Sequence, residues 1–173
     1  MGEYAQSCLA RERMFQYFSE KYNTPICIYR LNYANDVTYG VLLEIAKSVY
    51  EQKPLDLSMG YVNVIWQGDA NEIAVRALKH CAVPPKIVNV TGHETVSVRK
   101  VAEEFGILLN QTPQFINEEK STALLSNAAE SVRLFGEPRV NLKQMIEMLA
   151  EWVKQGGKTI DKPTHFQERE GQF

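Results

Sequence analysis

The sequence has few of the features that mark whole classes of proteins. Its three cysteines, Cys8, Cys27 and Cys81, are odd in number and far apart, and no two of them form a C-x-x-C pair. We therefore expect neither a disulfide framework nor a zinc site. Its three histidines show no metal-ligand spacing either, so we expect no bound metal. Reduced thiols in a cytoplasmic protein are the plain interpretation.

Long apolar runs and an excess of charge are also absent. No run approaches the roughly 20 apolar residues of a membrane-spanning helix, and no basic region followed by an apolar stretch marks a secretory signal. The formal net charge is −2 and the pI is near 6.0, so we expect neither nucleic acid nor a membrane as partner. The 173 residues suffice for one domain with a sizeable core.

The chain does contain an alternation of helical and strand patterns. Helices are predicted over 1–23, 38–53, 69–78, 97–106, 122–135 and 141–155, and strands over 26–31, 61–66 and 87–90, with a short extended piece near Phe115. Such alternation predicts an α/β fold. Two or three core strands are fewer than the about four to six of a typical sheet, so the sequence looks short of strands on its N-terminal side.

Three helices have polar residues at their expected starts. Ser97 and Asn141 each precede an apolar helical pattern and are predicted N-caps. Asp69 is followed three residues later by Glu72, which is the spacing of a capping box. We therefore interpret Asp69 as a helix cap rather than a catalytic acid.

The first helix carries the pattern on which the function depends. Helical spacing places Tyr4, Cys8, Phe15 and Phe18 on one stripe, which we predict to be the buried edge of the helix. This stripe resembles the active-site helix of the extended short-chain dehydrogenase/reductases, the NAD-dependent epimerase/dehydratase family. That family has Tyr-x-x-x-Lys, with a Glu eight residues after the Tyr. Tyr4 and Glu12 match, and Cys8 stands where the lysine should be.

The resemblance continues in order along the chain. It includes the strand that ends in Arg30, the segment Trp66-Gln-Gly-Asp69, the strand over 87–92, and Leu134-Phe-Gly-x-Pro138. These segments follow the C-terminal half of the family, and the G-x-G-x-x-G of the front half is absent. The resemblance implies a partial Rossmann-like fold, with few parallel strands plus the helical substrate-side domain.

The same resemblance implies a division of the chain and a cofactor. Residues 1–157 would be the C-terminal portion of an epimerase/dehydratase-like domain that lacks its front half, and the polar residues 158–173 a disordered tail. NAD or NADP would be the cofactor of the full-length protein, with a small-molecule substrate. We expect no cofactor on this chain alone, because the phosphate cradle is missing.

Individual site residues are also implied by the resemblance. Tyr4 would pass a proton to or from the substrate hydroxyl and contact the cofactor. Arg30-Leu-Asn32-Tyr33 is similar to the family's Arg-x-x-Asn-x-Tyr-Gly, although one residue shorter. Asn32 is therefore a candidate contact to cofactor and substrate, and Tyr33 a candidate contact to substrate. The other interpretations are a packed helix tyrosine for Tyr4 and a polar loop residue for Asn32.

Cys8 leaves the activity open. A tyrosine with its ordinary pKa of about 10 needs help to act as a base, and a thiol supplies no positive charge. Arg11 shares the stripe, but seven residues give about 10 Å of rise, which we judge too far for it to replace the lysine. Cys8 is either a small buried hydrophobe or a reactive thiol near a helix N-terminus. The alternative function is a non-catalytic ligand-binding or assembly domain.

Two further expectations concern the substrate and the oligomer. Nucleotide-sugar members of the family hold a phosphate with an arginine about seven residues before the aspartate, and here Val62 takes that place. We therefore do not expect a standard nucleotide sugar as substrate, unless Lys47, Lys53 or a residue upstream of the chain substitutes for the arginine. In the family the tyrosine helix commonly packs against its twin in a dimer. Met14, Phe15, Phe18, Val41 and Ile45 supply apolar surface for such an interface, so we expect a homodimer.

Overall fold

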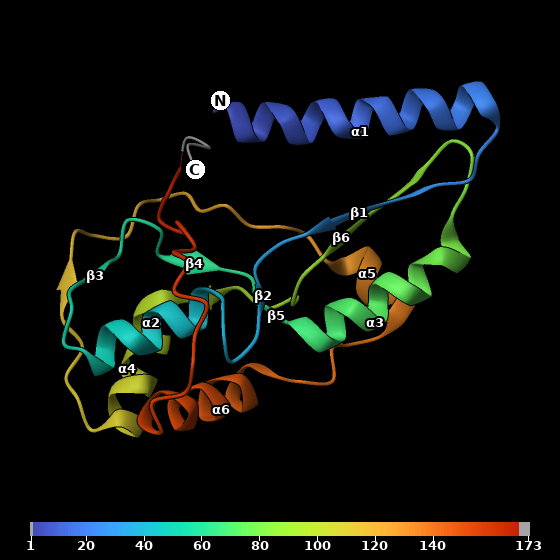
Figure 1. Ribbon diagram of the computed structural model, residues 1–173. Helices are drawn as coiled ribbons and strands as arrows, with labels where there is room; N and C mark the ends of the chain where they lie inside the picture. The colour runs from blue at the N-terminus through green and yellow to red at the C-terminus, as the bar shows by residue number, and fades with distance from the viewer. Residues whose placement is uncertain (1, 170–173) are drawn as a thin grey trace.

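The computed structural model describes residues 2–169, which form helices and short strands in alternation (Figure 1). In chain order the elements are α1 (Glu3–Tyr22), β1 (Cys27–Leu31), β2 (Ala34–Asn35), α2 (Val41–Tyr50), β3 (Leu55–Asp56), β4 (Tyr61–Val62), β5 (Ile65–Trp66), α3 (Gln67–Ala77), the 3-10 turn η1 (Leu78–His80), β6 (Lys86–Val90), β7 (Val96–Ser97), α4 (Val98–Leu109), β8 (Phe115–Ile116), α5 (Ala129–Phe135) and α6 (Leu142–Lys154). The strands pair two by two. The pairs β1–β6, β2–β5 and β3–β8 are parallel, and β4–β7 is antiparallel. The predicted α/β class is confirmed.

The longest strand pair is β1 with β6. Its register runs from Cys27 opposite Lys86 to Leu31 opposite Val90, in agreement with the two predicted apolar strands. Among residues 2–169 no other strand pairs with β1, so one of its edges has no strand partner. The single strand predicted over 61–66 is instead two short strands, β4 and β5, which pair with different partners.

The main core lies where α2, α4 and α6 pack against one another. Each helix turns its apolar stripe inward: Leu42 and Ile45 from α2, Phe105 from α4, and Ile146 and Leu149 from α6 are all fully or almost fully buried. These side chains recur at helical spacing, so the stripe read from the sequence is the face that packs. At about 25 cal/mol per Å² of apolar area, this burial is the main force that holds the three helices together.

A second, smaller core links the parallel strands to α3 and α5. Val88 and Val90 of β6 pack with Ile73 and Ala77 of α3 and with Phe135 of α5. Every second residue of β6 contributes, as the two-residue period of a strand requires. This cluster fixes the β1–β6 pair against α3.

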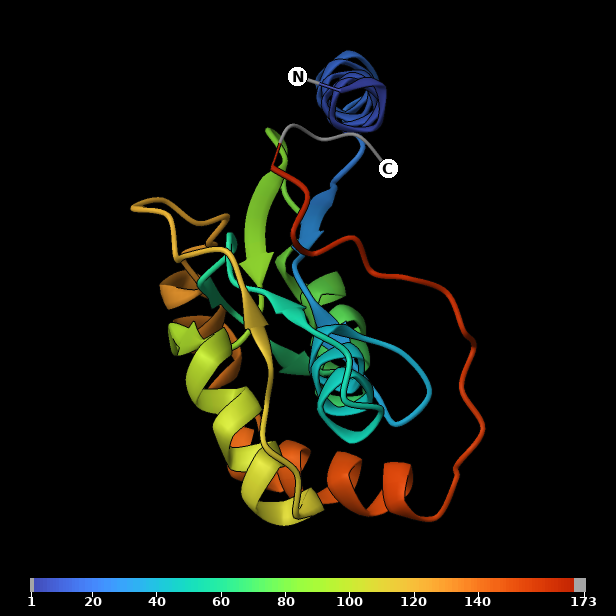
Figure 2. The same cartoon turned by 90° about the vertical axis from the view of Figure 1, so that its left-hand side faces the viewer.

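Helix α1 lies apart from both cores. Figure 1 shows it beyond the β1–β6 pair, and Figure 2 shows it end-on, at the opposite end of the molecule from α6. Ser19 is its only buried residue among those the structure describes, while Tyr4 is 57% exposed, Phe15 53% and Phe18 41%. The prediction that this stripe is buried is therefore wrong for this chain, because no second layer covers it. None of the helices in residues 2–169, the long α1 included, is apolar enough to cross a membrane.

Residues 158–169 form an irregular segment, called the strap here, that runs across α2 at the right of Figure 2. Ile160 N–H donates to the carbonyl of Thr38 at 3.0 Å, the Thr164 hydroxyl donates to Glu44 at 2.6 Å, and Phe166 is fully buried in the main core. This placement differs from the disordered tail predicted for residues 158–173. The prediction rested on the polar composition of the segment and did not take the side chain of Phe166 into account. Residues 170–173, which the prediction also included, lie outside the described part of the chain.

The helix starts agree with two of the three predicted caps. The Ser97 hydroxyl accepts from the backbone of Lys100, and Asn141 forms a capping box with Gln144. Asp69 is not a cap: α3 begins at Gln67, so Asp69 lies inside its first turn. The helix predicted over 122–135 is also shorter, because regular structure starts only at Ala129.

Candidate active site

The site predicted from the sequence lies where α1 faces β1. Helix α1 runs antiparallel to β1, so its first turn lies toward the carboxyl ends of the β1–β6 pair (Figure 1). Tyr4 and Cys8 line a cavity of about 680 Å³ together with Arg11, Glu12 and the strand residues 26–31. Ligands of open α/β sheets bind at the carboxyl ends of the strands, so the end of this cavity near Tyr4 is the candidate site.

The electrostatic environment of Tyr4 is set by its neighbours on α1. The pKa of Tyr4 is raised, first by the charge of the Cys8 thiol when it ionises, then by a hydrogen bond with Cys8 and by partial burial. The nearby Arg11 guanidinium opposes this rise and lowers the pKa. The net direction is the reverse of what a proton-accepting tyrosine needs, because a raised pKa reduces the tyrosinate present near neutral pH.

Arg11 is closer to the site than the helical rise suggested. Its Nη2 donates to the Cys8 sulfur at 3.6 Å, and its charge reaches Tyr4. The helical rise predicts that Arg11 is too far from Tyr4 to replace the lysine directly; its hydrogen bond is with Cys8, and its charge lowers the pKa of Tyr4 through space. The spacing of three residues between Cys8 and Arg11 was the available signal, since such residues are neighbours on a helix surface.

The main polar tie between α1 and the strand pair is an ion pair. Arg30 of β1 donates from Nε and Nη2 to the two carboxylate oxygens of Glu12, at 2.8 and 2.6 Å. This two-point contact lowers the pKa of Glu12 and raises that of Arg30. Glu12 and Arg30 each belong to a family pattern, 18 residues apart, and neither pattern indicates that the two side chains bind each other. The contact holds α1 over β1 and so gives the cavity its second wall.

Asn32 and Tyr33 lie beyond this cavity, on the chain that leads into the main core. The N–H of Asn32 donates to the carbonyl of Val90 at 3.0 Å and extends the β1–β6 pairing by one residue. Tyr33 packs against the main core, where burial raises its pKa, and its hydroxyl lies 3.5 Å from the carbonyl oxygen of Phe166. The structure therefore does not bring Tyr33 together with Tyr4. Asn32 lies between the cavity beside α1 and the main core.

Asp69 has a structural role that the sequence did not indicate. Its carboxylate is buried and accepts a hydrogen bond from the backbone N–H of Val140 at 2.9 Å. Val140 directly precedes Asn141, the cap of α6, so Asp69 ties α3 to the start of α6. Val62, at the place of the family's phosphate-binding arginine, is fully buried.

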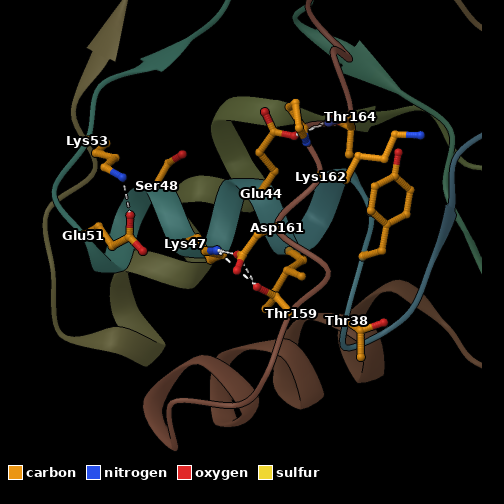
Figure 3. A pocket seen from close by; sticks show the side chains of 14 residues that line it. Thr38, Glu44, Lys47, Ser48, Glu51, Lys53, Thr159, Asp161, Lys162 and Thr164 are labelled. Atoms are coloured by element: carbon orange, nitrogen blue, oxygen red, sulfur yellow. Dashed lines mark hydrogen bonds and ion pairs between the residues drawn. The ribbon is translucent and has the colours of Figure 1, made fainter.

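The two lysines considered as substitutes for that arginine line a different cavity, of about 280 Å³, between α2 and the strap (Figure 3). Lys47 donates to Asp161 at 2.8 Å, and Lys53 pairs with Glu51 at 2.6 Å. Figure 3 shows that both lysines point toward these carboxylates. Because their charges are matched locally, they do not form a cluster of positive charge for a diphosphate.

The residues present do not fit the diphosphate of a dinucleotide. Such a group is held by a glycine-rich turn between a strand and a helix, and the sequence contains no G-x-G-x-x-G. Gly156-Gly157 follows α6 instead of preceding a helix, and the backbone of Gly157 lies against the ring of Trp152.

Comparison with known proteins adds to this geometry. Scans of protein-family models and of curated protein sequences find no match. Among solved structures, the UDP-glucuronic acid 4-epimerase from Bacillus cereus in complex with NAD has a TM-score of 0.74 and 16% identity, over 90% of this chain and 52% of that one. The dTDP-glucose 4,6-dehydratase from Bacillus anthracis has a TM-score of 0.70 and 18% identity, over 90% and 53%.

A reductase gives the same picture. The GDP-mannoheptose C4 reductase from Campylobacter jejuni, with NADP bound, has a TM-score of 0.64 and 16% identity, over 84% of this chain and 55% of that one. The chain thus spans about half the length of the solved structures that it matches. At these identities the likeness establishes the fold, and it confirms the fold that the sequence resemblance implied. The chain has the partial Rossmann-like fold of the NAD-dependent epimerases and dehydratases.

Proposed function

We propose that this chain is the C-terminal, substrate-side portion of an NAD-dependent epimerase/dehydratase-like oxidoreductase. The observation that carries the proposal is the position of Tyr4, one turn from Cys8, in the cavity that α1 forms along β1, with the first turn of α1 toward the carboxyl end of that strand. The coverage of about half of each matched structure supports it as well, and so does the edge of β1 that has no strand partner among residues 2–169. NAD or NADP and a small-molecule substrate would then be held jointly with a glycine-rich front half.

In this proposal Tyr4 exchanges a proton with the substrate hydroxyl, and Arg11 supplies the positive charge that Cys8 does not. Asn32 contacts the ligand from the end of β1, whereas Tyr33, which packs against the main core, holds the backbone that carries Asn32. A dinucleotide supplies hydride chemistry when bound. The chain's own residues position the substrate and move the proton.

The direct test measures dinucleotide binding and turnover separately. Titration of NAD into the 173-residue chain by calorimetry should give binding weaker than about 1 mM, because the diphosphate has no cradle. Micromolar binding would contradict the division into two halves. In a polypeptide that carries both halves, Tyr4→Phe should lower turnover by about 10²- to 10⁴-fold, the usual contribution of a positioned acid or base.

Tyr17→Phe is the matched control, because Tyr17 lies on the same helix and is also 57% exposed. It should leave turnover unchanged. Equal effects of Tyr4→Phe and Tyr17→Phe would remove Tyr4 from the mechanism.

The raised pKa of Tyr4 favours a second candidate, a non-catalytic ligand-binding or assembly domain with the same fold. Cys8→Lys separates the two functions. If the native two-half protein turns over its substrate and Cys8→Lys increases the rate, the oxidoreductase is supported. If there is no turnover before the substitution and restored turnover after it, the non-catalytic domain is supported.

We also propose that the chain forms a homodimer through the exposed face of α1, in the cytoplasm. Met14, Phe15 and Phe18 supply exposed apolar area for this contact, whereas Val41 and Ile45, which the sequence analysis assigned to it, are buried in the main core. Phe15→Glu with Phe18→Glu should shift the protein to monomer in sedimentation. Val75→Glu, at a position 70% exposed on α3, is the control and should leave the assembly unchanged.

A further inference from the structure

Two of the three cysteines, which the sequence places far apart, lie opposite each other at the start of β1. Just before them, Ile26 and Ala82 form an antiparallel bridge. Ile26 N–H donates to the carbonyl of Ala82 at 3.0 Å, and Ala82 N–H donates to the carbonyl of Ile26 at 3.2 Å. Because the two segments run antiparallel at this bridge, Cys27 and Cys81 are the next residues to face each other beside it. Where such pairing continues, the Cα atoms of this non-hydrogen-bonded position lie about 4.5 Å apart.

The two side chains also share a face. Tyr29, two residues after Cys27 on β1, donates its hydroxyl to the carbonyl of Ala70 on α3, so this face of the strand looks toward α3. Cys27 packs on the same side, against the second core. The Cys81 thiol points the same way, with its sulfur 4.0 Å from the carbonyl oxygen of Ala77 at the end of α3.

The proximity of the thiols is visible in their electrostatics. Burial raises the pKa of Cys27, and the Cys81 thiol raises it further, while Lys86 opposes both. Both residues keep part of their surface exposed, so a small reagent can reach them. Cα atoms of bridged cysteines usually lie 4.4–6.8 Å apart, and opposed residues of an antiparallel pair meet that condition.

We propose that Cys27 and Cys81 form a reversible disulfide when the protein meets a small-molecule disulfide such as oxidised glutathione. One protein thiolate attacks a sulfur of the reagent, breaks its S–S bond and releases one glutathione thiolate. The second protein thiolate then attacks the protein-bound sulfur and displaces the second glutathione. The two protein thiols are oxidised, and one reagent disulfide is reduced to two thiols.

The bond would fasten the first residue of β1 to the chain that leaves α3. It closes a long loop of chain, which restricts the unfolded state and makes the oxidised protein harder to unfold. The site thus couples the redox state of the thiols to the stability of the β1–β6 pair, to which α1 is bound through Glu12 and Arg30.

The test is disulfide mapping on the 173-residue protein. The reduced protein is incubated with oxidised glutathione at a pH of about 8.5, near the ordinary thiol pKa, then alkylated and digested with trypsin. Cys27 lies in the tryptic peptide 22–30 and Cys81 in the peptide 80–86. The expected product is these two peptides joined. At micromolar protein it should exceed any product joined through Cys8 by on the order of 100-fold, because neighbouring thiols have a millimolar effective concentration.

Three variants make the result decisive. Cys8→Ser should leave the joined peptides unchanged, and Cys27→Ser and Cys81→Ser should each abolish them. If Cys27→Ser does not fold, Cys81→Ser alone decides, because its residue lies outside the strand. The oxidised protein should also melt at a higher temperature than the reduced one, and dithiothreitol should reverse the shift. Persistent glutathione adducts on Cys27 or Cys81 without a cross-link, or a cross-link through Cys8, would overturn the proposal.

Discussion

Helices α1 and α4 both carry large apolar side chains at helical spacing, yet they end in opposite environments. In α4 the ring of Phe105 is fully buried between α2 and α6. In α1 the ring of Phe15 is mostly exposed, and the helix is held to the rest of the chain chiefly by its Arg30–Glu12 contact and by the turn that follows Ser19. The same sequence signal therefore predicts an apolar face reliably, but not whether this chain covers that face.

The difference divides the molecule into two regions. The α2–α4–α6 region, with the strap over it, contains its own core and is held together by apolar burial. Within residues 2–169, the region of α1, β1 and β6 has a single pair of long strands with one unpaired edge, a small apolar core against α3 and α5, and the surface ion pairs Arg30–Glu12 and Lys86–Glu130. We expect the first region to respond to changes in packing and the second to respond to pH, salt and partners.

The sharpest way to break this comparison is to remove one ring from each helix. Phe105→Ala should lower the free energy of unfolding by about 4 kcal/mol, because it deletes a buried ring from a core that cannot fully collapse. In the monomeric protein, Phe15→Ala should change it by less than about 0.5 kcal/mol, since the side chain is exposed. Urea unfolding followed by circular dichroism measures both. Similar losses would mean that α1 is part of the same core.

The strap allows a second test of the same contrast. Phe166→Ala should cost about 3 kcal/mol, because the ring is buried in the main core although its chain segment is irregular. Ile160→Ala is the control, with a side chain that is 62% exposed, and should cost less than about 0.5 kcal/mol. A strap that tolerates Phe166→Ala as well as Ile160→Ala would behave as the disordered tail that the polar composition predicts.

The smallest expected effect concerns the charged contacts of the second region. Arg133 and Lys86 hold Glu130 by hydrogen bonds and lower its pKa to about 2. A lowered carboxyl pKa contributes stability that is present above the unfolded value of 4.5 and is lost as the pH falls toward about 2. Glu130→Gln should therefore weaken β6 and α5 slightly at pH 7 and make no difference near pH 2.

Hydrogen exchange of the β6 and α5 amides, measured against pH, follows this effect directly. Because Glu130 is at the surface, the difference should be small and should shrink further in high salt. Glu147→Gln on α6, which loses only a 3.8 Å surface pair with Lys143, serves as the control in the first region. An equal pH response of the two variants would argue against the division into two regions.

The comparison also shows how far the sequence could lead. The stripes of α2, α4 and α6 and the caps Ser97 and Asn141 followed from local spacing, because helix periodicity and capping depend on neighbours in the sequence. The fold followed from a resemblance spread over the whole chain. These parts of the fold depend on short-range patterns, and they were confirmed.

The remaining features depend on contacts between distant residues. Asp69 looked like a cap of its own helix, but its carboxylate binds Val140, 71 residues later. The sequence did not indicate that Cys27 and Cys81 are neighbours, or that Phe166 is buried although it lies in a polar segment. In both cases the contact joins residues far apart in the sequence, and local patterns do not predict such contacts. For the candidate site, the sequence indicated Tyr4 and Cys8. The contact of Arg11 with Cys8, and the effect of its charge on Tyr4, became visible only in the structure.

The turn between α1 and β1 has one more consequence. The Ser19 hydroxyl donates to the carbonyl of Thr24 at 2.7 Å, Thr24 N–H donates back to Ser19 at 2.9 Å, and Asn23 ends the helix in the left-handed conformation. The direction of α1 is therefore fixed at its base before anything covers its apolar face. A protein surface that docks there meets a pre-organised helix and loses little conformational entropy on binding, so even a modest contact area would suffice for a lasting complex.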